Sequence, residues 1–355
     1  MKTIGYAAPS AGAPLVPHAF NRRELRPNDV AMEILFCGVC HSDLHHARND
    51  WGWTRYPVVP GHEIVGRVTA VGSAVTRLAV GDPVAVGCMV DSCQTCDQCR
   101  KGEEQFCREG LTETYNSKDR ITGEVLFGGY SKHLVVREEF VLRVPEGLDP
   151  SRVAPLLCAG ITTYSPLRAW NVGPGSRVGV IGLGGLGHMA VKLAVAMGAE
   201  VTVLSRNANK RADALKLGAT QLLVSTDAQA MVHAQASFDL LIDTVPVCHD
   251  PMPYVPLLDI DGTLAIVGQV GPMDAWTTLP FILGRRRVAG SVIGGIRETQ
   301  ELLEFCAQKN ILPECEMIRM QDINAAFERL ERSDVHYRFV IDMASLSGPE
   351  QAVAQ

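Results

Sequence analysis

The sequence predicts an α/β protein that combines a β-rich domain with a doubly wound parallel sheet. Its 355 residues are enough for two domains of about 150 residues each. Short apolar runs separated by Gly and Pro fill the first part of the chain, whereas a strand–helix–strand rhythm begins near residue 174. We therefore place a first domain at residues 1–155, a parallel-sheet domain at residues 156–294, and a return to the first domain at residues 295–355.

Composition and charge favour a small-molecule partner. With 46% hydrophobic and 20% charged residues the chain can bury a sizeable core, which excludes a mainly disordered or fibrous protein. A formal net charge of −6 gives no general attraction to nucleic acid or to a membrane surface. The N-terminus lacks a secretory signal pattern, and no run approaches the ~20 apolar residues that span a bilayer. We expect a cytoplasmic protein, in which clustered cysteines bind metal more often than they form disulfides.

The β-rich domain is predicted from short strands joined by turns. Residues 30–36 alternate in part between apolar and polar side chains, as a strand with one buried face does. Apolar runs at 64–71 and 83–86 are separated by turns that contain glycine. Near the end of the chain, a helix over 298–309 leads to a strand near 337–342, which we expect to rejoin this domain.

The parallel-sheet domain is predicted from strands that alternate with helices. A strand and a helix are followed by Gly198, which ends the helix, and by a second strand. Such βαβ units repeated over roughly 140 residues form one doubly wound sheet. The expected strands cover residues 177–181, 200–204, 238–243, 262–268 and 288–293, and the expected helices run from the first strand to Met197 and over residues 209–216.

A glycine-rich turn connects the first of these strands to its helix. Its pattern is G-x-G-x-x-G, in which the first glycine permits a tight turn, the second allows a pyrophosphate to approach the backbone, and the third allows close packing. Because the turn lies between a strand and a helix of a βαβ unit, it predicts a dinucleotide-binding site. Its residues are Gly182, Leu183, Gly184, Gly185, Leu186 and Gly187.

The end of the second strand predicts which dinucleotide binds. An acidic residue there would bind the ribose 2′-hydroxyl and repel a 2′-phosphate, but the chain has Ser205 at this position. Arg206, Lys210 and Arg211 follow and would attract a phosphate. The sequence therefore predicts NADP(H) rather than NAD(H).

Four cysteines in one loop predict a structural zinc site. Cys93, Cys96, Cys99 and Cys107 follow the pattern C-x2-C-x2-C-x7-C and would fill all four positions of a tetrahedral zinc ion. An iron–sulfur cluster would use the same ligand type. A nucleic-acid-binding zinc ribbon is disfavoured, because the loop has only two basic residues between its ligands and no aromatic run.

Three further metal ligands are dispersed along the chain. Cys40, His62 and Cys158 are separated by more than a hundred residues in all, and their spacing alone does not join them. Taken singly, each fits a buried core residue. Together they would form a Cys2His zinc site with one open position, the arrangement known for alcohol dehydrogenase. A carbonyl that accepts hydride from a nicotinamide needs such a Lewis acid.

Taken together, these motifs resemble zinc-dependent medium-chain alcohol dehydrogenases, specifically the branch similar to cinnamyl-alcohol dehydrogenase. The resemblance extends over nearly the whole chain and implies a GroES-like catalytic domain with a Rossmann cofactor domain. It also implies two zinc ions per chain and an enzyme that acts on alcohols or aldehydes with NADP(H). It rests on residues 38–45, 60–63, the four-cysteine loop, residues 158–162, the glycine turn and residues 337–342.

The resemblance implies a role for each matching residue of the catalytic site. Cys40, His62 and Cys158 would bind the catalytic zinc, with Glu63 behind it or as a transient ligand. Asp43 would orient the ring of His62. Ser42 and His45 would relay a proton between the reacting oxygen and solvent. Further positions would lie near the cofactor, namely Thr162, Thr244, Gly268, Ser291, Val292, Ile293 and Arg338.

Substrate class and assembly are predicted more coarsely. The tryptophan that plant members carry after the fourth loop cysteine is absent, which favours a broad aldehyde reductase, with Trp51 and Trp53 as candidate walls of the pocket. Two alternatives are a polyol or secondary-alcohol dehydrogenase of the same superfamily and a non-catalytic cofactor-binding relative. The resemblance implies a homodimer that pairs through edge strands of the cofactor domains near residues 288–293, where the sequence itself has an apolar edge of a kind that is usually covered.

Overall fold

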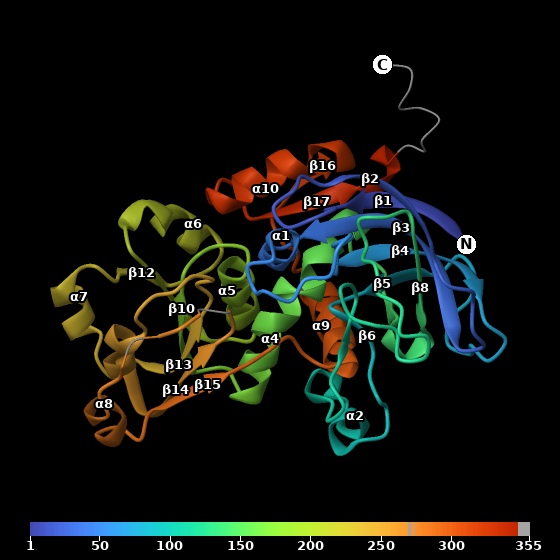
Figure 1. The fold of residues 1–355 in the computed structure, drawn as a ribbon. Helices are drawn as coiled ribbons and strands as arrows, with labels where there is room; N and C mark the ends of the chain where they lie inside the picture. The colour runs from blue at the N-terminus through green and yellow to red at the C-terminus, as the bar shows by residue number, and fades with distance from the viewer. Residues whose placement is uncertain (269–270, 274, 347–355) are drawn as a thin grey trace. The chain divides into compact units, whose positions relative to one another are not determined.

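The computed structural model describes residues 1–268, 271–273 and 275–346. The chain forms two compact units (Figure 1). The first unit contains residues 1–158 and the described residues from 294 onward, and the second unit contains residues 159–293. The sequence placed these changes after residues 155 and 294 instead.

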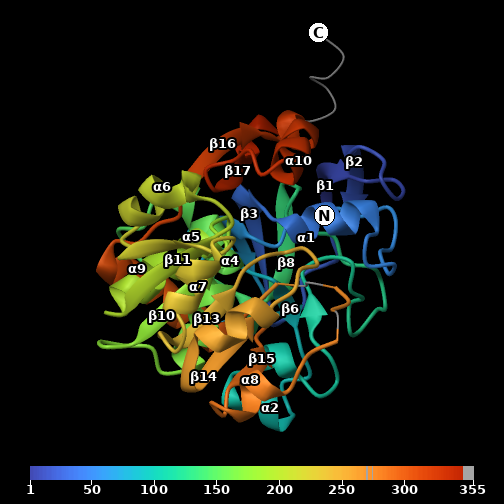
Figure 2. The ribbon, with the colours of Figure 1, turned by 90° about the vertical axis from the view of Figure 1, so that its left-hand side faces the viewer.

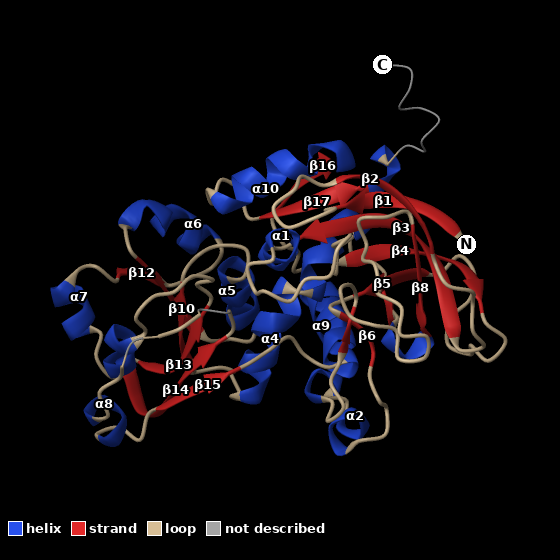
Figure 3. Ribbon diagram, viewed as in Figure 1, coloured by secondary structure: helices blue, strands red, loops and turns tan. Residues whose placement is uncertain are grey.

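The first unit is built on a seven-stranded sheet, which Figure 3 shows in red. The path β16-β17-β3-β4-β5-β9 forms the sheet, and β8 pairs with β3 outside this path. The last strand, β17, runs antiparallel to β3 and pairs Phe339 with Val39. The end of the chain thus lies in the same sheet as its first long strand. The strands are β3 (Asp29–Val39), β4 (Ile64–Val71), β5 (Pro83–Val86), β8 (His133–Arg137), β9 (Leu142–Arg143), β16 (Cys315–Arg319) and β17 (Arg338–Asp342).

Smaller elements complete the first unit. Strands β1 (Lys2–Ala7) and β2 (Val16–Asn21) pair with each other, as do β6 (Met89–Asp91) and β7 (Thr112–Glu113). Helix α1 begins directly after β3, so the end of that strand and the start of the helix place functional side chains together. The α-helices are α1 (His41–Arg48), α2 (Asp97–Lys101), α3 (Pro150–Val153), α9 (Ile296–Lys309) and α10 (Ile323–Glu331). Two 3-10 helices, η1 (Glu104–Phe106) and η3 (Ala154–Leu157), each directly precede a cysteine that was predicted to bind metal.

The second unit is a six-stranded parallel sheet in the order β12-β11-β10-β13-β14-β15. This order reverses between β10 and β13, as in a doubly wound dinucleotide-binding fold. Apolar side chains such as Ile181, Leu241 and Leu264 are buried in its core. The strands are β10 (Arg177–Ile181), β11 (Glu200–Ser205), β12 (Gln221–Val224), β13 (Phe238–Asp243), β14 (Leu258–Ile266) and β15 (Arg287–Gly290), and Figure 2 shows them from a second direction.

Helices α4 to α8 belong to this unit, and some elements differ from the sequence prediction. Strand β12 was not predicted because its four residues give too short an apolar run. Strand β15 ends at Gly290 rather than Ile293, because Ile293 has a left-handed backbone with φ of +36° that a strand cannot include. The helices are α4 (Ala159–Ala169), α5 (Gly187–Ala196), α6 (Arg211–Lys216), α7 (Ala228–His233) and α8 (Leu279–Ile282). Across the described ranges, no helix is both long and apolar enough to cross a bilayer.

Candidate functional site

The four loop cysteines lie together in the first unit and are called the loop group below. Their ligand atoms all lie within 4.8 Å of one another. Cys93 Sγ lies 3.8 Å and Cys96 Sγ lies 3.5 Å from Cys99 Sγ. A tetrahedron with Zn–S bonds of about 2.3 Å has edges of about 3.8 Å, so this spacing fits one zinc ion.

Backbone N–H groups point at the sulfur atoms of the loop group. The N–H of Cys93 donates to Cys107 Sγ at 3.4 Å, and the N–H of Cys96 donates to Cys93 Sγ at 3.3 Å. Led by the N–H of Thr95, such donors lower the pKa of the Cys93 thiol to about 6. These donors therefore favour the thiolate form of Cys93 that a metal requires, whereas burial raises the pKa of the Cys99 thiol to about 12.

A second set of candidate ligands, called the dispersed group below, also lies within the first unit. It contains Cys40, His62, Glu63 and Cys158, whose ligand atoms lie within 4.8 Å of one another. Cys40 follows β3, His62 and Glu63 precede β4, and Cys158 follows η3. The two Sγ atoms are 3.8 Å apart, which is again a tetrahedral edge. The fold thus unites residues that their spacing in the sequence did not.

The fit of a metal to the dispersed group is supported by an unpaired buried oxygen. Glu63 is completely buried, and its Oε2 has no hydrogen-bond partner within the described part of the chain. A carboxylate oxygen without a partner is costly unless it faces a cation. Two thiols, one imidazole and a carboxylate make a donor set that suits zinc.

Asp43 holds residues of the dispersed group in place through hydrogen bonds. This carboxylate is completely buried and accepts the N–H of Cys40 and the N–H of Gly61, both at 2.9 Å. Its Oδ1 lies 3.1 Å from His62 Nδ1, and the Tyr130 hydroxyl donates to its Oδ2 at 3.2 Å. A proton on Nδ1 leaves Nε2 of His62 free as a metal ligand. Asp43 therefore fixes both a ligand and the two turns that carry ligands.

Arg338 forms a buried ion pair with Glu63. The guanidinium of this β17 residue donates to Glu63 Oε1, and both side chains are almost inaccessible to solvent. Burial would lower the pKa of Arg338, but Glu63, Cys40 and Cys158 outweigh it, so the pKa is raised and the group stays charged. The sequence placed Arg338 along the cofactor, and this ion pair with Glu63 was not predicted.

Ser42 and His45 both lie on α1. Ser42 Oγ is 3.7 Å from Cys40 Sγ, so the hydroxyl lies beside the dispersed group. His45 Nδ1 is 2.7 Å from Asp50 Oδ2, and the His45 side chain is partly exposed. The structure gives no direct hydrogen bond between Ser42 and His45, both of which it describes.

In the second unit, the glycine turn connects β10 to α5. Gly182 has a φ of +89°, a conformation that favours glycine. A Cβ on Gly187 would overlap the carbonyl oxygen of Gly182, whereas a Cβ on Gly184 would meet nothing within 4 Å. The turn thus packs tightly at Gly187 and leaves open space at Gly184, where a pyrophosphate can approach the backbone. This open backbone fits a dinucleotide.

The other predicted cofactor residues of this unit follow the carboxyl ends of parallel strands. Thr244 follows β13, and its hydroxyl donates to the carbonyl of Ile181 at 2.8 Å. Ser291 follows β15, and its N–H donates to the carbonyl of Ile266 at 3.0 Å. Ligands of doubly wound sheets bind at this edge. Gly268 follows β14, Val292 and Ile293 follow Ser291, and Thr162 lies in α4.

The cationic residues after β11 take different positions. Ser205 is the last residue of β11, one residue beyond the strand expected over residues 200–204. Lys210 Nζ donates to the carbonyl oxygen of Leu183 at 2.7 Å, so this ammonium is bound to the glycine turn. Burial lowers the pKa of Lys210. Arg206 is exposed, and no acidic residue ends β11.

Comparisons with known proteins agree with this geometry. Residues 26–146 match the family model of the alcohol dehydrogenase GroES-like domain, and residues 185–308 match that of the zinc-binding dehydrogenases. An NADP-dependent alcohol dehydrogenase C of Mycolicibacterium smegmatis is 53% identical over 98% of this chain and 99% of its own. The aldehyde reductase YahK of Escherichia coli is 50% identical over 98% of this chain and all of its own.

Solved structures give the same result. A cinnamyl alcohol dehydrogenase of Sorghum bicolor superposes with a TM-score of 0.94 at 46% identity, over 97% of this chain and 98% of its own. The structure of CAD from Helicobacter pylori complexed with NADP(H) superposes with a TM-score of 0.90 at 42% identity, over 97% of this chain and 99% of its own. The chain belongs to the zinc-dependent medium-chain alcohol dehydrogenases. The predicted family, its branch similar to cinnamyl alcohol dehydrogenase, the fold class and an oxidoreductase function are confirmed.

A row of aromatic rings in this alcohol dehydrogenase leads away from the dispersed group. The ring of Tyr115 lies 5.8 Å from that of His62 and 5.0 Å from that of His46. His46 meets Trp51 and Trp53 edge-on, each at 4.9 Å between centroids. Burial lowers the pKa of His46 to about 4, so its ring is neutral at pH 7. The sequence singled out both tryptophans but missed Tyr115 and His46, whose residue types give no distinct signal.

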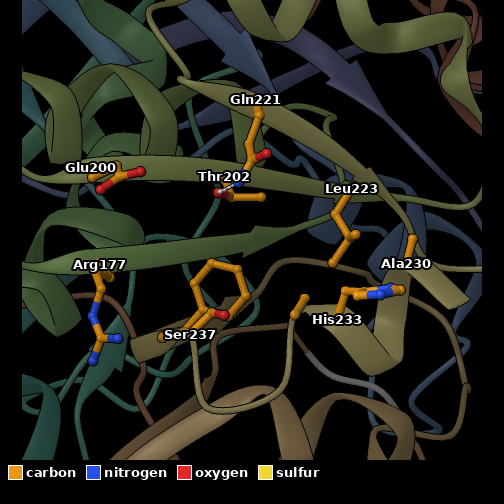
Figure 4. A pocket seen from close by; sticks show the side chains of 10 residues that line it. Arg177, Glu200, Thr202, Gln221, Leu223, Ala230, His233 and Ser237 are labelled. Carbon is orange, nitrogen blue, oxygen red and sulfur yellow. Dashed lines mark hydrogen bonds between the residues drawn. The ribbon is translucent and has the colours of Figure 1, made fainter.

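The alcohol dehydrogenase also has a pocket of about 490 Å³ at the amino ends of its parallel strands, opposite the carboxyl ends that the predicted cofactor residues follow. Figure 4 shows it between the first residues of several strands, with Thr202, Gln221 and Leu223 around it and His233 from α7 beside it. The pocket contains none of the predicted site residues. Its polar and apolar side chains do not converge on one recognisable chemistry, and we assign the reaction to the groups described above.

Proposed function

We propose that this alcohol dehydrogenase interconverts aldehydes and primary alcohols of broad structure with NADP(H). The observation that carries the proposal is the dispersed group, where two thiols, an imidazole and a carboxylate lie within 4.8 Å of one another. A Cys2His set leaves one coordination position of zinc for a substrate oxygen. The relatives named NADP-dependent alcohol dehydrogenase and aldehyde reductase support this assignment.

Each residue of the first unit has a proposed part in the reaction. When bound, zinc supplies a Lewis acid for the substrate oxygen, and NADPH supplies the hydride. Cys40, His62 and Cys158 hold the metal, and Asp43 keeps the ring of His62 in the binding tautomer. Glu63 would add negative charge to the metal-binding group, and Arg338, which pairs with Glu63, would balance that charge.

Proton transfer is assigned to α1. Reduction of an aldehyde leaves an oxygen that must gain one proton, and oxidation of an alcohol must release one. Ser42 Oγ lies beside Cys40 Sγ and therefore next to the reacting oxygen. His45 is partly exposed and is hydrogen-bonded to Asp50, so it would exchange protons with solvent, while Ser42, which has no direct hydrogen bond to it, would serve the reacting oxygen.

The preference for NADP(H) is argued from charge at the end of β11. Ser205 stands where an acidic side chain would repel a 2′-phosphate. Arg206 is exposed and free to meet that phosphate, while Lys210 adds positive charge against the glycine turn. The backbone of residues 182–187 receives the pyrophosphate. Thr162, Thr244, Gly268 and residues 291–293 are proposed contacts of the ribose and nicotinamide.

An aromatic surface supports activity on apolar aldehydes. Trp51 and Trp53 stack at 5.8 Å with an interplanar angle of 14°, and Trp53 is 47% exposed. Such a surface binds aliphatic and aromatic chains alike, with differences of about 1–3 kcal/mol between them. We therefore propose a broad aldehyde reductase rather than an enzyme restricted to cinnamyl substrates.

We also propose that two copies pair through β15. This strand ends the parallel sheet, and apolar side chains near it are exposed, Ile282 at 69% and Leu283 at 74%. An exposed apolar edge is usually covered by another chain. Sedimentation at micromolar concentration should give the mass of a dimer, and a monomer would contradict this. The reduced thiols of both metal groups fit a cytoplasmic location.

One experiment tests the central proposal. The purified enzyme is analysed for zinc and assayed for NADPH and NADH oxidation with aliphatic, aromatic and sugar aldehydes. We expect two zinc ions per chain, one for each group, turnover of several aldehydes, and a higher kcat/KM with NADPH. A single zinc without turnover, or a preference for NADH, would contradict the proposal.

A further inference from the structure

The cysteine lobe, residues 93–107 with α2 and η1, contacts the start of α9 within the first unit. The N–H of Ile296, the first residue of α9, donates to Glu104 Oε2 at 3.0 Å. Arg297 Nη2 donates to the carbonyl of Lys101 at 2.6 Å. A Cβ on Gly295 would overlap the carbonyl oxygen of Gly102, so the two backbones approach as closely as glycine allows. Three separate contacts therefore connect the lobe to one helical turn.

Glu104 serves α9 as a substitute for a capping residue. The N-cap of α9 is Gly295, which has no side chain to accept the free N–H groups of the first turn. The Glu104 carboxylate, which is 9% exposed, supplies one acceptor and places a negative charge near the positive end of a 14-residue helix. Glu104 itself is held by the lobe, since its carbonyl accepts the N–H of Cys107 at 3.0 Å.

This contact lies next to the point where the chain leaves the second unit. The boundary falls between Ile293 and Gly294, two residues before α9 begins. Ile293 is β-branched and has a φ of +36°, a conformation that persists only when its surroundings hold it. Before it, the N–H of Ser291 is bound to the carbonyl of Ile266 at 3.0 Å. After it, the chain is held by Gly295 and Ile296 against the lobe.

We propose that Glu104 is a positioning residue through which the cysteine lobe fixes the start of α9 and the strained crossover segment, residues 291–293. The lobe then does more than stabilise the fold, because it holds in place the backbone of residues 291–293, which we propose to contact the nicotinamide. This consequence for the cofactor rests on the proposed function. The contact between Glu104 and α9 does not.

The test compares E104A with E104Q and with E103A, in which the exposed neighbour of Glu104 is changed. Zinc content, hydrogen exchange of residues 291–299 and steady-state kinetics are measured on each full-length protein. We expect E104A to keep both zinc ions, to exchange faster over residues 291–299, and to raise the KM for NADPH roughly five- to tenfold with kcat changed about twofold at most. E104Q keeps an acceptor for Ile296 and should restore most of both properties, and E103A should match the wild type.

Unchanged exchange over residues 291–299 in zinc-loaded E104A overturns the proposal, and so does faster exchange with an unchanged KM for NADPH. If E104A does not fold, R297A decides the matter, because Arg297 is exposed and its substitution removes the contact with Lys101 together with an ion pair to Glu301 inside α9. R297A should give a smaller increase in exchange over the same residues, and no increase overturns the proposal. A wild type that does not use NADPH contradicts the proposed function instead, and the exchange comparison still tests Glu104.

Discussion

The two metal-binding groups of the first unit differ in how the chain assembles them. The loop group takes its four thiols from residues 93–107, whereas the dispersed group joins Cys40 to Cys158 across 118 positions. A local turn with backbone N–H donors is enough for the first group. The second group requires β3, β4 and η3 to be in place. The loop group therefore depends on local sequence, and the dispersed group depends on the fold of the whole unit.

The strongest test of this difference is Cys158→Ala, which removes one ligand of the dispersed group. We expect zinc to fall from two ions per chain to one and activity to fall about 1,000-fold or more, because the Lewis acid is lost. Metal analysis and NADPH oxidation measure both effects. Cys306→Ala is the control, since Cys306 is buried but belongs to neither group. Full activity of C158A would show that the dispersed group is not the reaction centre.

Cys96→Ser tests the loop group in the same way. We expect one zinc ion to be lost and the Tm to fall by about 5–10 °C, because a structural zinc contributes folding free energy directly. The dispersed group should remain loaded, since none of its ligands lies in the loop. Calorimetry and metal analysis give the two readings. Loss of both ions at once would contradict the independence of the two groups.

Asp43→Asn weakens only the dispersed group. Asn keeps the shape of the side chain but loses the charge that holds His62 in the binding tautomer. We expect zinc to bind the dispersed group about 10- to 100-fold more weakly, as measured by competition with a chelator. Asp97→Asn, at the exposed ion pair with Arg108 beside the loop group, is the matched control and should change neither affinity.

Mild acid provides the smallest test, through His46 beside the dispersed group. Burial lowers its pKa from 6.5 to about 4. Below pH 6.5 the unfolded chain protonates this histidine, whereas the folded protein does not until about pH 4. The free energy of unfolding is therefore unaffected by His46 above pH 6.5 and decreases as the pH falls towards 4. We expect His46 to account for a loss of about 1–2 kcal/mol in unfolding free energy between pH 7 and pH 5. Urea denaturation of the wild type and of His46→Gln measures it, and equal losses in both proteins would contradict this role.

The same difference between local and distant sequence explains what could be predicted. The loop group and the glycine turn each occupy one short stretch, so spacing alone gave their ligands and their conformation. The ligands of the dispersed group were joined only by resemblance to a family. Glu63 and Arg338 form their ion pair because β17 pairs with β3, a contact between the two ends of the chain that no local pattern reports.

Contacts formed in the folded chain account for other features that the sequence did not predict. Lys210 was expected at a phosphate, which stays a prediction, and its bond to the carbonyl of Leu183 on the glycine turn was not foreseen. Strand β15 was expected to extend to Ile293, but the backbone there turns left-handed. His46 and Tyr115 were assigned no role, although the fold places their rings between His62 and the two tryptophans. The contacts of Lys210 and Tyr115 depend on neighbours that are remote in the sequence.

The pairing of β17 with β3 has a consequence for biosynthesis. A ribosome releases Glu63 and the ligands around it long before it reaches Arg338, the cation that balances the buried carboxylate. Until that arginine emerges, the nascent chain would have to bury an uncompensated charge, which costs several kcal/mol. The loop group can acquire its metal during translation. We therefore expect the dispersed group to mature only after the last strand has been made, and a chain truncated before β17 to be inactive.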